Sequence, residues 1–63
     1  MQLIVIDVWI EYNILVANLW FKRDDGEVVM FDVQRPIKIW ENLLDEEALV
    51  GLYSLELTMF YGE

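Results

Sequence analysis

The first third of the chain alternates with a period of two residues. From Leu3 to Phe21 it is rich in Ile, Val, Trp and Tyr. The even-numbered positions of this segment form an unbroken apolar row: Ile4, Ile6, Val8, Ile10, Tyr12, Ile14 and Val16. The odd-numbered positions are mixed, and this period predicts β-structure. A single strand of about twenty residues would be roughly 66 Å long, too long for a domain whose radius of gyration is expected to be about 11 Å. We therefore expect a turn or bulge at residues 11–13, unless the N-terminal part crosses to a second subunit.

A hairpin signal follows. Lys22-Arg23-Asp24-Asp25-Gly26-Glu27 lies between two β-rich runs, and Asp-Gly favours the positive φ angle that tight hairpin turns need. The return strand is predicted over 28–34, where apolar residues occupy every second position. Pro36 ends it, because proline has no backbone N–H to donate to the sheet.

The pattern changes after the proline. In the segment 37–44, Ile39, Trp40, Leu43 and Leu44 have helical spacing and form one apolar stripe. The acidic run that follows either extends this helix or caps a short second turn. From 49 to 61 a period of two returns and predicts a final strand. The expected fold is α+β, a single domain over 1–63: a small antiparallel sheet of three to four strands with one short helix, in the order β-β-α-β.

Composition limits the chemistry of the chain. It has no Cys and no His, which excludes disulfides and thiolate zinc sites and removes the usual general base. We expect neither an enzyme nor a bound cofactor. Hydrophobic residues make up 57% of the chain although its net charge is −8. Small domains without disulfides or metals often oligomerise, so we expect a homodimer that completes the sheet or helix face.

The charge restricts the partners. A net charge of −8 opposes binding to nucleic acid and to anionic membranes and favours association with a basic protein surface. No leader segment and no apolar run long enough for a membrane span is visible, so a cytoplasmic location is expected. The acidic candidates lie in two groups, which are Asp24, Asp25 and Glu27 in the hairpin and Asp45, Glu46 and Glu47 after the predicted helix. Either they form a solvated face, or they imitate the closely spaced phosphates of DNA.

Trp40 allows two interpretations. A tryptophan at helical spacing is usually a core residue, but this chain has many other aromatic residues, and exposed tryptophans are favoured as binding anchors. The hairpin acids lack the alternating oxygen ligands of a calcium loop, so the turn itself explains them better than a metal site does.

The order of these features resembles the small dimeric phage-encoded uracil-DNA glycosylase inhibitors. The resemblance covers roughly residues 15 to 57 and lies in an acidic Asp24-Asp25-Gly26 hairpin, a helix with the pair Trp40-Glu41, and an acidic turn before the last element. It implies an apolar pocket that captures the leucine which the glycosylase inserts into DNA. Trp40 would be a wall of this pocket and Glu41 a polar contact. Leu44 stands where the family has a tyrosine, which would make the pocket more apolar.

The sequence therefore predicts a stoichiometric DNA-mimicking inhibitor of uracil-DNA glycosylase, with a pocket near Trp40, Leu43 and Leu44. Two alternatives stay open. The target is another DNA-binding enzyme, such as a restriction enzyme or a CRISPR effector, or the chain is a non-catalytic structural subunit whose apolar faces join copies of itself.

Overall fold

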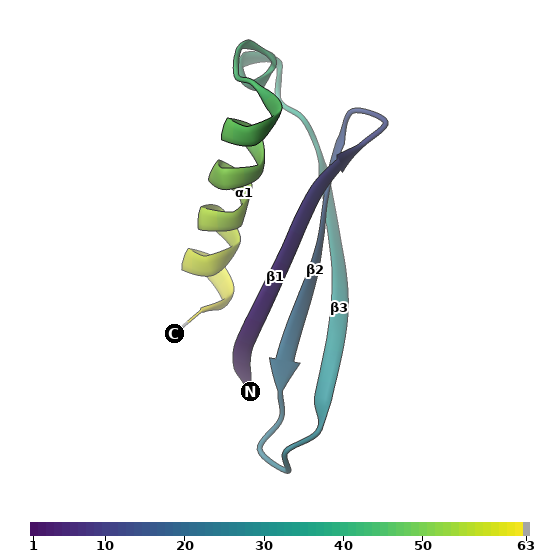
Figure 1. The fold of residues 1–63 in the computed structure, drawn as a ribbon, viewed down its shortest axis with the longest axis vertical. Coiled ribbons are helices and arrows are strands. Elements are labelled where there is room, and N and C mark those ends of the chain that lie inside the picture. Colours follow the sequence, from purple (N-terminus) through teal and green to yellow (C-terminus); the bar gives the residue numbers. More distant parts are fainter. Residues whose placement is uncertain (63) are drawn as a thin grey trace.

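The protein is a three-stranded antiparallel sheet with one long helix on one face (Figure 1). The structure is a computed structural model and describes residues 1–62. The strands are β1 (Gln2–Glu11), β2 (Ile14–Lys22) and β3 (Val28–Pro36), in the spatial order β1-β2-β3. A short 3-10 helix, η1 (Ile39–Leu43), leads into α1 (Glu46–Tyr61). The α+β class is thus confirmed, with a meander of three strands followed by the helix.

The predicted final strand is wrong, because residues 46–61 form α1. The Asp45 carboxylate accepts a 2.8 Å hydrogen bond from the backbone N–H of Ala48 and caps the helix, and Glu46 and Glu47 occupy its first turn. Acidic groups at a helix N-terminus are stabilised by the helix dipole. The order β-β-α-β is corrected to β-β-β-η-α. In place of the predicted helix over 37–44, the structure has only the short 3-10 helix η1.

The predicted break at residues 11–13 is a two-residue hairpin turn. Tyr12 and Asn13 both have positive φ angles, 49° and 64°, as in type I′ turns, whose twist matches that of the flanking strands. The first apolar segment therefore folds back on its own chain as β1 and β2. The second turn is also confirmed, with Gly26 at φ 90° and the Glu27 N–H donating a 3.0 Å hydrogen bond to the Asp25 carboxylate.

The core lies between β2 and α1. Strand β2 is the central strand, and its odd-numbered residues face the helix and are buried: Leu15, Ala17, Leu19 and Phe21. The helix contributes Leu49, Tyr53 and Leu57, which are four residues apart and fall on one face. Parts of β1 and β3 pack around this cluster.

The helix covers only part of the sheet, since its backbone lies closest to the edge strand β1. Phe31 of β3 pairs with Leu19 in the register and faces the same side, yet Phe31 is 48% exposed and Leu19 only 1%. The molecule measures 43 × 21 × 15 Å. Its accessible surface is 4725 Å², against about 4,250 Å² expected for a compact monomer of this mass. Many large apolar side chains are exposed, among them Ile39, Met59 and Phe60.

Candidate interaction groove

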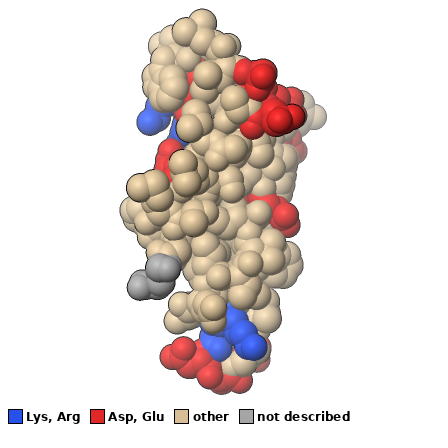
Figure 2. Space-filling view, turned by 60° about the vertical axis from the view of Figure 1, so that its left-hand side comes forward, with Lys and Arg blue, Asp and Glu red and all other residues tan. Residues whose placement is uncertain are grey.

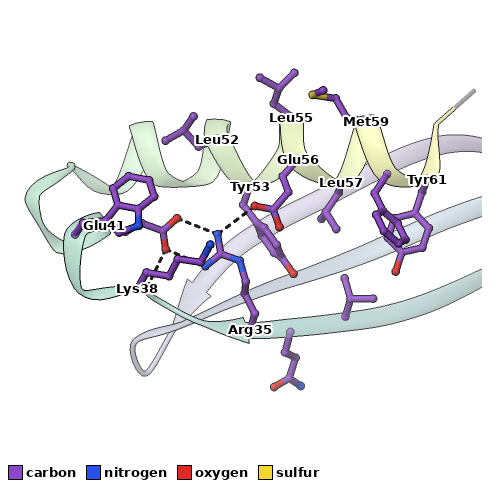
Figure 3. Close-up of a pocket in the computed structure, with 14 residues that line it drawn as sticks. Arg35, Lys38, Glu41, Leu52, Tyr53, Leu55, Glu56, Leu57, Met59 and Tyr61 are labelled. Atoms are coloured by element: carbon purple, nitrogen blue, oxygen red, sulfur yellow. Dashed lines mark hydrogen bonds and ion pairs between the residues drawn. The ribbon is translucent and has the colours of Figure 1, made fainter.

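An open groove of about 780 Å³ runs along α1 beside the C-terminal part of β3 (Figure 3). The side of the helix that borders it carries large apolar side chains. Leu52, Leu55 and Met59 project away from the sheet, whereas Tyr53 and Leu57 point toward it (Figure 3). The first three are 44%, 56% and 77% exposed, and their i, i+3, i+7 spacing makes one apolar stripe.

The polar end of the groove is built around Arg35. Its two terminal nitrogens donate 2.9 Å hydrogen bonds to the two carboxylate oxygens of Glu41, and one of them also donates a 3.4 Å bond to Glu56 (Figure 3). The guanidinium carbon lies 5.1 Å from the centroid of the Tyr53 ring, which is a cation–π contact. Arg35 thus joins β3 to η1 and to α1.

These contacts shift the pKa values of the residues that line the groove. The hydrogen bonds from Arg35, together with the 2.8 Å bond from the Lys38 backbone N–H, lower the pKa of Glu41 to about 2. The same carboxylate raises the pKa of Arg35 further above its ordinary value. Burial raises the pKa of the Tyr53 hydroxyl. The four charged residues that line the groove are Arg35, Lys38, Glu41 and Glu56. Their charges sum to zero, because there are two cations and two carboxylates.

The structure separates the residues that were predicted to form one pocket. Trp40 borders the groove and is 56% exposed, so it is a surface residue and not part of the core. Glu41 is 2% exposed, and both of its carboxylate oxygens accept hydrogen bonds from Arg35. Neither oxygen is therefore available to a partner. Leu43 is 89% exposed and lies outside the groove, and Leu44 packs toward the core.

The acidic candidates are also separated. The β2–β3 turn and the start of α1 lie at opposite ends of the molecule (Figure 1), and acidic groups gather toward both ends with a mostly uncharged surface between them (Figure 2). At the turn, Arg23 pairs with Asp25 and Glu27, and the N-terminal amine lies 3.8 Å from Asp24. These pairs weaken the negative field of the turn. The six predicted acidic residues do not form one array.

The most important groove residues were missed at the sequence level. Arg35 carries the polar cluster, and the stripe of Leu52, Leu55 and Met59 makes the apolar wall. A usable signal was present, since Asp45 followed by two glutamates is a helix start. Taken with that start, the spacing of the three apolar residues indicates a helix face.

Comparisons with protein-family models, with curated proteins and with solved structures found no match to this chain. Within residues 1–62, no helix is both long and apolar enough to cross a membrane. In the same part of the chain, no three carboxylates lie close enough together to hold a metal ion.

Proposed function

We propose that the chain is a non-catalytic assembly module that pairs with a second copy of itself through the groove beside α1. The observation that carries this proposal is the contrast between the groove and the rest of the protein. The whole chain has a net charge of −8, whereas the charges of the residues that line the groove sum to zero, and three of these four residues, Arg35, Glu41 and Glu56, are held in ion pairs. A second copy can approach here without like-charge repulsion.

Energetics favour the same surface. Two copies of the stripe formed by Leu52, Leu55 and Met59 can pack as a helix–helix seam, with the side chains of one helix between those of the other. Burial of apolar surface stabilises such a contact by about 25 cal/mol per Å². The exposure of these three side chains, 44%, 56% and 77%, is consistent with a face that a dimer covers.

The test is the oligomeric state in solution. Sedimentation equilibrium over a wide concentration range is expected to give the mass of a dimer for the unmodified chain. Leu55→Glu places a charge in the seam and is expected to give a monomer. Leu43→Glu is the matched control, because Leu43 is 89% exposed and lies outside the groove, and it is expected to stay dimeric. A monomeric unmodified chain, or a dimer that Leu55→Glu leaves intact, contradicts the proposal.

Inhibition of uracil-DNA glycosylase is the second candidate, with a cytoplasmic site of action. The exposure of Trp40 beside an apolar groove favours it, since such a groove can accept an inserted leucine. The test is a titration of the chain into a uracil-excision reaction with a limiting amount of bacterial enzyme. Loss of activity at one dimer per enzyme supports the inhibitor, and full activity at large excess excludes it.

A further inference from the structure

The sheet face opposite α1, here called the outer face, is crossed by rows of residues paired across all three strands, and the three central rows form a pattern. The register places Val5, Trp20 and Met30 in one row. The next row is Asp7, Asn18 and Asp32, and the third is Trp9, Val16 and Gln34. Residues paired in this way point to the same side of the sheet. A polar row therefore lies between two rows with large apolar side chains.

The outer face is uncovered. The one α-helix of residues 1–62 lies on the other side of the sheet (Figure 1). On the edge strands, Val5, Trp9 and Met30 are 47%, 38% and 43% exposed. Two tryptophans and a methionine on one open face are unusual for a surface that stays in water, and contiguous apolar patches of this kind mark sites of protein contact.

The polar row defines what can cover this face. Asp7 and Asp32 stand on the two edge strands with Asn18 between them, so their backbones are about 10 Å apart, which is two strand spacings. Neither carboxylate has an ion-pair partner among residues 1–62. A carboxylate that loses its water without gaining a donor or a positive charge is strongly destabilising. The covering surface must therefore supply hydrogen-bond donors at this row, and a cationic donor does so best because it faces two carboxylates.

A second copy of the chain does not meet this condition. Two outer faces packed with their polar rows opposite each other would bring two copies of Asp7 and of Asp32 into one dehydrated layer, and Lys22, the cation of this face, lies two rows away from it. Like charges directly opposite each other are destabilising. The outer face is thus unsuited to self-association, in contrast to the neutral groove beside α1.

We propose that the outer face binds an amphipathic helix of a different protein, with one lysine or arginine between two apolar side chains. The spacing supports this occupant. Successive rows are two residues apart along a strand, or about 6.7 Å, and residues i and i+4 of a helix are about 6 Å apart along its axis. A helix lying along the strands therefore matches the three rows with apolar, basic and apolar residues at i, i+4 and i+8. Its cation lies over Asp7, Asn18 and Asp32.

The test uses three synthetic amphipathic peptides of about 18 residues that differ only at the central position, which is Lys, Gln or Glu. Each carries a fluorescein, and binding to the full chain is followed by fluorescence anisotropy. The Lys peptide is expected to bind about tenfold more tightly than the Gln peptide, and the Glu peptide more weakly than both. Equal binding of the three, or no binding at about 1 mM, overturns the proposal.

Two double variants distinguish the effect of the polar row on binding from the effect of the net charge. Asp7→Asn with Asp32→Asn, and Glu46→Gln with Glu47→Gln, each change the net charge from −8 to −6. Only the first pair is expected to abolish the preference for the Lys peptide. If both pairs reduce it equally, the preference is a general charge effect and the proposal fails.

The unmodified chain gives an independent readout through its three tryptophans. In an NMR titration with the Lys peptide, the indole N–H signals of Trp9 and Trp20 are expected to shift, while that of Trp40 stays in place. A shift of Trp40 alone places the peptide in the groove and overturns the proposal. A dimer that survives Leu55→Glu and tightens when Asp7 and Asp32 are replaced by asparagine places a second copy on the outer face, and this result also overturns it.

Discussion

Arg35 and Glu41 form a two-bonded ion pair in which both N–O distances are 2.9 Å and the Glu41 side chain is 3% exposed. The pair joins the last strand to the 3-10 turn that leads into the helix. The Lys38 N–H binds the same carboxylate at 2.8 Å, so Glu41 also fixes the geometry of that turn. The position of the helix on the sheet thus depends on one buried carboxylate.

Glu41→Gln is expected to lower the free energy of unfolding by about 3 kcal/mol, because it leaves the Arg35 charge without its main partner. Glu56→Gln is the control, since Glu56 binds the same arginine at 3.4 Å but its side chain is 53% exposed. That variant is expected to lose less than about 1 kcal/mol. Urea denaturation measures both, and equal losses would show that the buried pair has no special role.

The same carboxylate makes stability depend on pH. Its pKa falls from 4.5 to about 2 on folding, so the folded state favours the ionised form. The stabilisation is complete above pH 4.5 and is lost as the pH falls from about 4.5 toward 2. The stability difference between the unmodified chain and Glu41→Gln is therefore expected to shrink over this range. Unfolding free energies at pH 7 and pH 3 test this, and a constant difference would contradict it.

Trp40→Ala is expected to change the free energy of unfolding by less than about 1 kcal/mol, because the side chain is 56% exposed. If Trp40 is a binding anchor in the groove, the same variant weakens the association of the two copies of the chain by about 2 kcal/mol or more. Thermal unfolding and a binding titration of the same preparation separate the two effects. Leu43→Ala, outside the groove, is the control for binding. Loss of the fold in Trp40→Ala would show that the tryptophan is structural.

Tyr12→Asn is expected to stabilise the protein by about 0.5–1 kcal/mol. Tyr12 has a φ angle of 49° and is 92% exposed, so it bears the steric cost of a left-handed backbone without compensating packing, whereas asparagine tolerates that conformation. Tyr12→Phe keeps the cost and is expected to be neutral. Chemical denaturation compares the two variants, and an asparagine variant no more stable than the phenylalanine one would exclude backbone strain.

The two hairpins were predictable because their signals are local. Asp25-Gly26 provides the positive φ of the second turn, and the polar break at 11–13 divides a segment too long for one strand. The register then follows from the two turns, since each fixes which residues pair across it. This part of the fold needs no information from distant residues.

The helix was not predictable from periodicity, because α1 is apolar on most of its circumference. Leu49, Tyr53 and Leu57 are buried at helical spacing, but they also fall on alternate positions of an apparent strand. Met59 and Phe60 are apolar although they are 77% and 78% exposed. Apolar residues on the exposed side of the helix mask the 3.6-residue repeat of its buried side. Only the cap residue Asp45 and the acidic first turn, Glu46 and Glu47, separate the helix from the strand interpretation. The groove was missed for the same reason, since its main wall is this helix.

The strand order β1-β2-β3 follows the order of the chain, so every sheet pairing joins neighbouring segments through a short turn. Such local pairings require little loop closure before they form, which favours rapid folding. The sheet is complete at Pro36, whereas the helix that covers its core face begins at Glu46. A sheet that forms before α1 packs on it therefore leaves the apolar side chains of β2 exposed, and transiently exposed apolar surface of this kind is prone to aggregation.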